Sequence, residues 1–298
     1  MIAERVLVTG ATGFVGSHVA RALAASGAEV HALVRPGARL DRVPDLVDVV
    51  TFHTVEARAE QVAAVVGGID PDITFHLATH FVAEHRPADI DALVESNVAA
   101  PTRLVDALAS GGRGVTLVNA GTAWQHVEGE SYRPKNLYAA TKQAFDDVLR
   151  HYTERRQLRV VTLNLYDTYG PGDHRGKLLS ALVAALRSGE PLALGSGEQL
   201  VDFVHVDDAV AAFLHAADGA RDSDDRTVPT YAISSGGACR VRDVVELLGE
   251  VAGRPVPVRW GARPDRPGDM VTPWYAGAPL PGWRPTISLR AGLAALLG

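Results

Sequence analysis

A tyrosine and a lysine stand four residues apart in the stretch NLYAATK, residues 136–142. Residues with this spacing share one face of a helix, so Tyr138 and Lys142 would point toward the same neighbour. An ammonium group near a phenol favours the phenolate and lowers the tyrosine pKa from about 10 toward working pH. Such a tyrosine can pass a proton to or from a substrate oxygen. The spacing therefore predicts an acid–base tyrosine with an activating lysine.

The position of this pair strengthens the prediction. With 7 tyrosines and three lysines in 298 residues, roughly 0.07 Tyr-x-x-x-Lys pairs are expected by chance. The pair follows a strand-like run that carries Thr122 at its end, and doubly wound sheets bind ligands at the C-terminal ends of their strands. We predict Thr122, Tyr138 and Lys142 as the catalytic residues, with Thr122 aligning the substrate oxygen. The alternative for Thr122 is a hydroxyl that bonds only to local backbone.

Short apolar runs alternate with longer amphipathic stretches over the first half of the chain. Strands are predicted at about 5–10, 28–34, 72–78, 114–121 and 158–166, and helices at about 14–27, 57–66, 88–110 and 137–155. This alternation is typical of a parallel sheet with helices on both faces. The predicted fold class is α/β, a doubly wound parallel (Rossmann) sheet.

The pattern changes from about residue 167. Glycine and proline become frequent, and short strands separate helices predicted at about 176–187, 207–217 and 241–252. We expect a dinucleotide-binding domain over residues 1–166. A smaller α/β substrate-binding lobe over residues 167–298 is expected to be partly interwoven with it.

Three glycines follow the first predicted strand in VLVTGATGFVGSHVA. The backbone would turn sharply at Gly10, admit a pyrophosphate at Gly13 and pack closely at Gly16. The helix that starts here offers free N–H groups and the positive end of its dipole to phosphates. The alternative is a glycine-rich turn without a ligand. The cofactor contacts predicted from this turn are Gly10, Thr12, Gly13, Phe14, Val15 and Gly16.

The second predicted strand ends without the acidic residue that would bind a ribose 2′-hydroxyl. Arg35 follows it directly, and a guanidinium suits a 2′-phosphate. Arg39 and Arg42 lie on the same loop. If these arginines are not simply solvated, they favour NADP(H) over NAD(H).

Composition excludes several classes of protein. The chain has 29 Lys and Arg against 35 Asp and Glu, a net charge of −6, and no basic block that would indicate nucleic-acid binding. Its single cysteine, Cys239, excludes an internal disulfide and a cysteine-rich metal site. No apolar run is long enough for a membrane span, and the N-terminus does not read as a signal peptide. We expect a cytoplasmic protein that has no metal site.

Together these motifs resemble the extended short-chain dehydrogenase/reductases, in particular their nucleotide-sugar epimerase/dehydratase/reductase branch. The resemblance extends over nearly the whole chain and includes FHLAT (75–79) and RPDRPGD (263–269). It implies a nucleotide-diphosphate sugar as substrate and a homodimer formed by the helices at about 88–110 and 137–155. The further cofactor contacts that it implies are Leu77, Ala78, Thr79 and Asn97.

Within this branch the chain resembles the reductases that complete deoxysugars, of the CDP-abequose and CDP-paratose synthase type. Dehydratases carry an Asp-Glu pair after the catalytic threonine, where this chain has Ala123 and Trp124. The resemblance implies NADPH-dependent reduction of the C4 keto group of a nucleotide-linked 4-keto-6-deoxyhexose. A 4-epimerase with tightly bound NAD, and a non-catalytic dinucleotide-sensing protein on the same fold, are the two alternatives.

Predicted substrate contacts rest partly on departures from the family pattern. Val201 replaces an arginine that commonly touches the substrate diphosphate, so Arg266 is expected to make that contact, with Arg175 or Lys177. Asp167 would repel a diphosphate and is placed near the sugar. The remaining predicted substrate contacts are His80, Trp124 and Gln125, although Trp124 could be an ordinary core aromatic.

Overall fold

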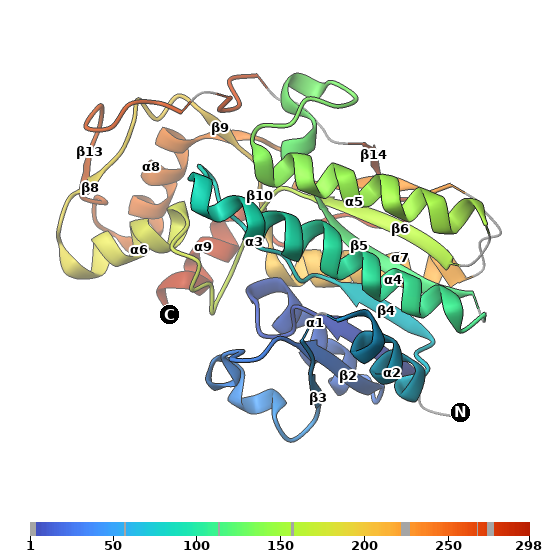
Figure 1. Ribbon diagram of the computed structural model, residues 1–298. Helices are drawn as coiled ribbons and strands as arrows, with labels where there is room; N and C mark the ends of the chain where they lie inside the picture. Colours follow the sequence, from blue (N-terminus) through green and yellow to red (C-terminus); the bar gives the residue numbers. More distant parts are fainter. Residues whose placement is uncertain are drawn as a thin grey trace.

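The computed structural model describes residues 4–56, 58–112, 114–155, 158–221, 227–266, 268–272 and 277–298. Its centre is an eight-stranded sheet in the order β14-β11-β6-β5-β4-β1-β2-β3, and all neighbouring strands are parallel (Figure 1). The strands are β1 (Arg5–Thr9), β2 (Glu29–Val34), β3 (Thr51–Thr54), β4 (Ile73–His76), β5 (Val115–Thr122), β6 (Leu158–Leu165), β11 (Thr230–Ile233) and β14 (Ala278–Pro279). The predicted Rossmann-like sheet is confirmed.

Helices cover both faces of the sheet because successive side chains of a buried strand point in opposite directions. Leu7 of β1 packs into an apolar cluster with α2 (Ala59–Ile69), α4 (Ala100–Ser110) and α5 (Leu137–Glu154). Its neighbours Val6 and Val8 pack into a second cluster that includes α1 (Phe14–Ala25) and α7 (Val206–Arg221). Two apolar layers therefore hold the sheet between the helices.

The strand order reverses beside β1, which lies between β4 and β2. Ligands of open α/β sheets bind beyond the carboxyl ends of the strands at such a switch point. The glycine-rich turn follows β1 and the stretch Leu77–Thr79 follows β4, so the topology brings both predicted cofactor segments to this point.

A smaller lobe lies at one end of the molecule, on the left in Figure 1. Its helices α6 (Leu178–Ser188), α8 (Val241–Ala252) and α9 (Leu289–Leu297) share a separate apolar cluster. Three short strand pairs accompany them: β7 (Asp167–Tyr169) with β10 (Phe203–His205), β8 (Leu192–Ala193) with β13 (Val258–Arg259), and β9 (Leu200–Val201) with β12 (Cys239–Arg240).

The chain passes between the two lobes more than once. After the first part of the small lobe, α7 returns to cover the large sheet, and β11 and β14 extend its edge. A single boundary after residue 166 therefore does not separate the two lobes. The elements α7, β11 and β14 follow that boundary in the sequence but belong to the large sheet and its covering helices.

The helix predicted at 88–110 is divided into three parts. It begins as α3 (Ile90–Val94), continues as a π-helical turn, η4 (Glu95–Ala99), and ends as α4. Pro101 lies at the start of α4 and has no N–H to bond the preceding turn. This irregular turn carries the buried Asn97. Short 3-10 helices occur at Leu40–Arg42, Pro44–Leu46, Pro87–Asp89, Ala123–Gln125 (η5) and Val127–Gly129. Within the described residues, no helix is both long and apolar enough to cross a membrane.

Candidate active site

The glycine-rich turn requires glycine at two positions. Gly10 has a φ of +78°, and a Cβ there would lie 2.6 Å from the backbone nitrogen of Ala78. A Cβ on Gly16 would lie 2.1 Å from the carbonyl oxygen of Gly10. Only glycine at these positions lets α1 and the segment after β4 approach the turn so closely. The sharp turn predicted at Gly10 and the close packing predicted at Gly16 are what the structure shows.

The first turn of α1 is open to an anion. Gly13 is the N-cap and is exposed, no side chain caps the helix, and the first turn contains no acidic residue. Phe14 is buried, whereas Thr12 and Val15 are less buried. Free N–H groups and the positive end of the helix dipole suit a pyrophosphate, so these residues fit the dinucleotide that the sequence predicts.

Arg35 lies directly after β2 and is exposed. In the part of the chain that the structure describes, its side chain makes no hydrogen bond or ion pair. Arg39, by contrast, bonds the Asp41 carboxylate through two nitrogens, at 2.8 and 2.6 Å. Of these two arginines, Arg35 is therefore the one whose guanidinium is not bonded to a protein carboxylate.

Tyr138 lies in the first turn of α5, which begins at a capped end. The Asn136 side chain accepts from the backbone N–H of Ala139 at 3.0 Å, as an N-cap residue does. The Tyr138 ring is buried against two aromatic rings, with ring centroids 5.0 Å from Phe81 and 6.5 Å from Trp124. These contacts fix the direction of the phenol.

The pKa of Tyr138 differs from the one predicted from the sequence. Burial raises the pKa of Tyr138 to about 12, while a hydrogen bond with Thr79 and the charge of Arg175 act in the opposite direction. Lys142 interacts electrostatically with His76 and Asp146 instead. The Tyr138 pKa is therefore raised by burial rather than lowered toward working pH, and the activating role of Lys142 stays a prediction. Tyr138 is a phenol at neutral pH, as a proton donor must be.

Lys142 is only 2% exposed and lies one turn after Tyr138 on the same helix. Burial lowers the pKa of Lys142 to about 8, and the charge of Asp146 opposes that shift. Its ammonium group makes no hydrogen bond to another described residue, so its donors can serve a bound molecule. The predicted placement of Tyr138 and Lys142 on one buried face of α5 is what the structure shows.

Thr122 ends β5 and caps the 3-10 helix η5. Its hydroxyl oxygen accepts from the backbone N–H of Trp124 at 3.3 Å, which is the local bond considered as its alternative role. The hydroxyl proton is not used by that bond and can be donated to a substrate oxygen. Local capping and substrate alignment are therefore compatible.

Gln125 was predicted to contact the substrate, but its side chain is bonded to neighbouring protein groups. It is 1% exposed, and its side-chain oxygen accepts from the Thr122 backbone N–H at 3.2 Å. Its amide nitrogen donates to Asp146 at 2.8 Å and Gln143 at 3.2 Å. The sequence TAWQ has the S/T-x-x-E/Q pattern of a capping box, which explains why the side chain turns inward. Gln125 supports Thr122 from behind.

Asn97 likewise supports the site and has no free amide atom for a cofactor. Its oxygen accepts from the Thr79 hydroxyl at 2.9 Å and the His80 backbone N–H at 2.8 Å. Its nitrogen donates to the His80 carbonyl and the Thr141 hydroxyl, each at 3.0 Å. All four hydrogen-bonding positions are filled. The predicted cofactor contact is therefore replaced by a role in holding Thr79 and His80.

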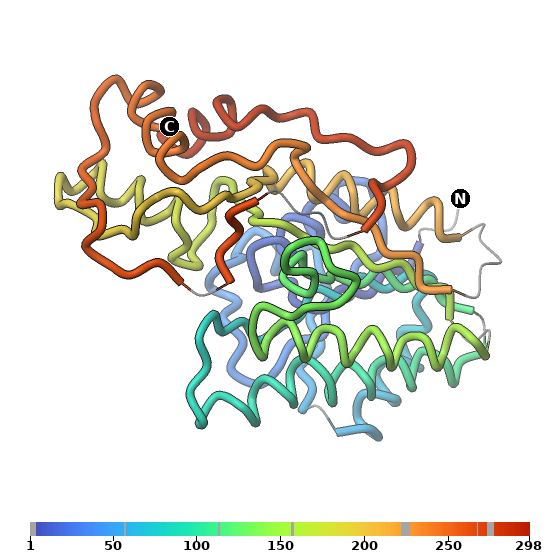
Figure 2. The backbone as a smooth tube through the Cα atoms, turned by 90° about the horizontal axis from the view of Figure 1, so that it is seen from above, coloured from blue at the N-terminus to red at the C-terminus, as the bar shows by residue number. Residues whose placement is uncertain are grey.

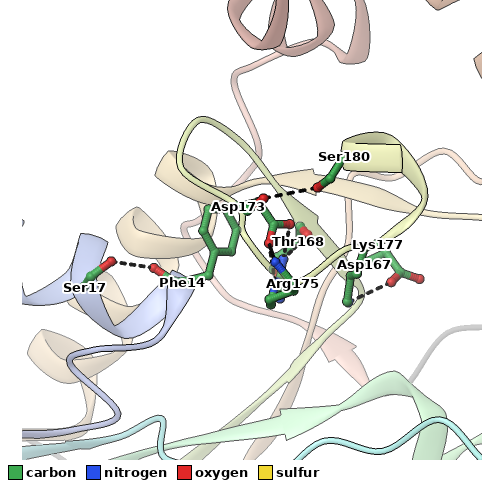
Figure 3. Close-up of polar contacts among 8 residues, drawn as sticks. All are labelled: Phe14, Ser17, Asp167, Thr168, Asp173, Arg175, Lys177 and Ser180. Atoms are coloured by element: carbon green, nitrogen blue, oxygen red, sulfur yellow. Dashed lines mark hydrogen bonds and ion pairs between the residues drawn. The ribbon is translucent and has the colours of Figure 1, made fainter. Parts of the chain in front are cut away.

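Arg175 links the small lobe to the glycine-rich turn. Its guanidinium carbon lies 4.4 Å from the centroid of the Phe14 ring. Figure 3 draws both side chains. Two nitrogens bond the Asp173 carboxylate at 2.7 Å each, and another bond of 2.7 Å reaches the Thr168 carbonyl. Burial acts to raise the pKa of Asp173, but these bonds and the charge of Arg175 hold it below its ordinary value. The charge of Arg175 is thus fixed between the turn and Tyr138.

Lys177 and Asp167 form an ion pair at 3.0 Å (Figure 3). Each side chain is about one-third exposed or less, and the Lys177 ammonium lies 5.6 Å from the centroid of the Phe81 ring. The pair carries no net charge, so it offers both a donor and acceptors to a polar ligand. The structure thereby brings two predicted substrate contacts together beside the aromatic cluster.

The segment before β14 reaches across to the loops of the large domain. Arg266 pairs with Glu84 at 3.0 Å, and both side chains are largely exposed. Lys135 pairs with Asp269 at 2.8 Å in a more buried position and lies 4.7 Å from the centroid of the Trp124 ring. Arg266 is therefore held at the mouth of the site by a carboxylate.

Sequence reasoning missed two features of this site. Phe81, 43% exposed, is one of them, because a single phenylalanine on a loop has no recognisable sequence pattern. The other is the ion pair of Lys135 with Asp269, which joins residues far apart in the chain, so that no local sequence pattern predicts it. His80, a predicted substrate contact, is half-buried, and its backbone N–H is bonded to Asn97.

Comparison with known proteins agrees with this geometry. Residues 6–230 match the NAD dependent epimerase/dehydratase family. The chain belongs to this family. It is thus related to enzymes that carry out oxidoreductase chemistry on nucleotide sugars, and the suspected branch is confirmed.

Individual relatives differ in their reactions. The chain is 26% identical to CDP-abequose synthase of Salmonella typhimurium, over 99% of this chain and 97% of that protein. It is 28% identical to dTDP-4-dehydro-6-deoxy-D-allose reductase of Streptomyces bikiniensis, over 85% and 83%. The solved structure of Thermus thermophilus UDP-glucose 4-epimerase in complex with NAD aligns with a TM-score of 0.82 at 27% identity, over 98% and 97%.

Proposed function

We propose that the protein reduces the C4 keto group of a nucleotide-linked 4-keto-6-deoxyhexose with NADPH. The observation that carries this proposal is the buried phenol of Tyr138, raised in pKa and placed with Thr122 and Lys142 at the carboxyl edge of the sheet. Similarity to CDP-abequose synthase and to a dTDP-4-dehydro-6-deoxy-D-allose reductase supports the choice of substrate class.

The chain's own residues account for the proton chemistry. When bound, the nicotinamide would supply a hydride to the carbonyl carbon. Thr122 donates a hydrogen bond to the carbonyl oxygen and aligns it, and Tyr138 gives its proton to the alkoxide that forms there. The phenolate left on Tyr138 is then stabilised by the positive charge of Arg175, which favours the charged form. Lys142 would hold the ribose hydroxyls of the bound cofactor with its unused N–H donors.

The substrate would lie between the aromatic cluster and the small lobe. Trp124 and Phe81 offer an apolar wall beside the Tyr138 phenol. The neutral Lys177–Asp167 pair suits sugar hydroxyls, whereas Arg266 at the mouth suits the diphosphate. We expect His80, which follows β4, to border the same space. We infer that Arg175 serves Tyr138 and the turn, because most of its donors already bond protein atoms.

A direct assay tests this function. The purified protein is mixed with NADPH, and separately with NADH, and an enzymatically generated dTDP-4-keto-6-deoxyglucose, and nicotinamide absorbance is followed. We expect oxidation that is faster with NADPH. CDP-linked 4-keto-6-deoxyglucose is assayed in parallel, since the related synthases differ in nucleotide. No oxidation with either sugar, together with NAD that co-purifies with the protein, would instead support a 4-epimerase, as the Thermus relative is.

Arg35 provides the test of cofactor choice. Replacing Arg35 with Asp puts a carboxylate where the 2′-phosphate is expected, and the KM for NADPH should rise about tenfold or more while that for NADH falls. Arg58→Asp, the same charge change at an exposed position before α2, should leave both KM values unaltered. Equal KM values for NADPH in the wild-type and Arg35→Asp proteins would contradict the assignment.

We further propose that the protein forms a homodimer through α4 and α5. These helices lie side by side along one flank in both views (Figures 1 and 2), and Ile90 and Val94 of the adjoining α3 are exposed apolar residues. Sedimentation of the purified protein would show twice the chain mass. A mass of one chain at micromolar concentration would contradict this proposal.

A further inference from the structure

A buried carboxylate lies directly behind the predicted catalytic residues. Tyr138, Lys142 and Asp146 follow one another at intervals of four on α5, so all three share the face that packs on the sheet. Asp146 is 8% exposed. The proposed reaction assigns it no role, yet a buried charge is costly unless neighbouring groups compensate it.

Three side-chain donors converge on Asp146. One carboxylate oxygen accepts from the Gln125 amide at 2.8 Å. The other accepts from the Asn119 amide at 3.1 Å and the Thr162 hydroxyl at 3.3 Å. Amide N–H groups can only donate, so both oxygens act as acceptors, which an ionised carboxylate does best. Burial raises the pKa of Asp146, while the bonds from Gln125 and Thr162 and the charge of Lys142 favour the ionised form. An asparagine at this position would turn its own NH₂ group toward one of these donors.

The first link from Asp146 leads to Thr122. Gln125 donates to Asp146 with its nitrogen, and this bond fixes the orientation of its amide. The amide oxygen then accepts from the Thr122 backbone N–H at 3.2 Å. The carboxylate thereby determines, through one intervening side chain, where the last residue of β5 lies.

The second link leads to Lys142 through charge. Among the described residues, the charged or titratable groups found to interact with Lys142 are Asp146 of its own helix and His76 of β4, and Tyr138 lies one turn earlier on that helix. Burial and the charge of Lys142 lower the pKa of His76 to about 3, and burial keeps Tyr138 a phenol, so both are neutral at physiological pH. Asp146 is thus the group that offsets the burial of the ammonium.

We propose that Asp146 is a positioning residue for both partners of Tyr138: its charge keeps Lys142 protonated, and its bond to Gln125 fixes Thr122. The part that concerns turnover rests on the proposed reductase function. The part that concerns Lys142 does not, because it describes the protein without cofactor or substrate.

The charge of Lys142 can be measured directly. The chain contains three lysines, at positions 135, 142 and 177. Protein labelled with ¹³C at the lysine ε-carbon therefore gives three side-chain signals, assigned with Lys135→Arg and Lys177→Arg. Titration of the unliganded wild-type protein should show Lys142 protonated at pH 7, with a midpoint below those of the other two lysines. A wild-type Lys142 that is neutral at pH 7 would overturn the proposal without any variant of Asp146.

Asp146→Asn should move the Lys142 midpoint down by about one pH unit or more, because the compensating charge is removed. Asp147→Asn is the matched control: it removes the same charge from the same helix at an exposed position and should leave the midpoint unchanged. The basic limb of the pH profile for NADPH binding, followed by nicotinamide fluorescence, should move in the same direction. An unchanged Lys142 midpoint in folded Asp146→Asn protein overturns the electrostatic role.

Gln125→Met tests the other link. It keeps the Asp146 charge but removes all three hydrogen bonds of the amide, so kcat should fall about tenfold while the Lys142 midpoint stays within about 0.3 pH unit of wild type. An unchanged kcat overturns the link to Thr122. If the wild-type protein reduces no 4-keto sugar but the Lys142 titration behaves as expected, the proposed function fails and the electrostatic role of Asp146 stands.

Discussion

Replacing Tyr138 with Phe is expected to lower kcat by roughly 10²–10⁴-fold, the usual contribution of a general acid. The substitution removes only the hydroxyl, and the ring keeps its contacts with Phe81 and Trp124. The fold and the affinity for NADPH should therefore be retained. Single-turnover measurements with the 4-keto sugar and a fluorescence titration with NADPH would separate the two effects.

Tyr132→Phe is a suitable control for this experiment, because Tyr132 is 45% exposed and its replacement removes an equivalent hydroxyl outside the site. The control should leave kcat unaltered. Turnover of Tyr138→Phe within about threefold of wild type would contradict the assignment of Tyr138 as proton donor.

Replacing Gly16 with Ala should damage both stability and cofactor binding. The new Cβ would lie 2.1 Å from the carbonyl oxygen and 2.7 Å from the carbonyl carbon of Gly10, and neither backbone atom can move aside without opening the turn. We expect the free energy of unfolding to fall by about 1–3 kcal/mol. The affinity for NADPH should fall about tenfold or more, since the phosphate-facing N–H groups move with α1. Chemical denaturation and a fluorescence titration would measure these changes.

The same substitution at Gly67 provides the contrast. Gly67 is an exposed residue inside α2, and a Cβ there would meet no atom within 4 Å. Ala is a better helix former than Gly, so Gly67→Ala should raise the free energy of unfolding by about 0.5–1 kcal/mol. If Gly16→Ala behaved like Gly67→Ala, the close approach of α1 to the turn would not be needed.

Those parts of the fold that depend on local pattern were predictable from the sequence. Alternating apolar strands and amphipathic helices predicted the Rossmann sheet, and the glycines predicted the turn. The return of α7, β11 and β14 to the large sheet was only allowed for, because a two-residue strand such as β14 has no periodicity to detect. The π-helical turn that carries Asn97 was missed for a related reason: its apolar pattern continues that of the helices on either side.

In the candidate site, too, only the features that depend on a local sequence pattern were predictable. Helical spacing placed Tyr138 and Lys142 on one buried face, but it did not show that burial would raise the Tyr138 pKa, nor that Arg175 from the loop after β7 would act on the phenol. Spacing fixes only where a side chain starts, whereas burial and tertiary partners decide which charges it interacts with. Gln125 is the exception that could have been found, because its capping-box pattern is local.

The ion pair between Lys135 and Asp269 has a consequence for recombining this protein with its relatives. The two residues come from the loop before α5 and from the segment before β14, and their side chains are 15% and 19% exposed. A chimera that exchanges the small lobe, but keeps the rest of the chain, would separate these partners and leave one largely buried charge without its counterpart. Substrate preference in this protein should therefore be transferable only when both segments are exchanged together.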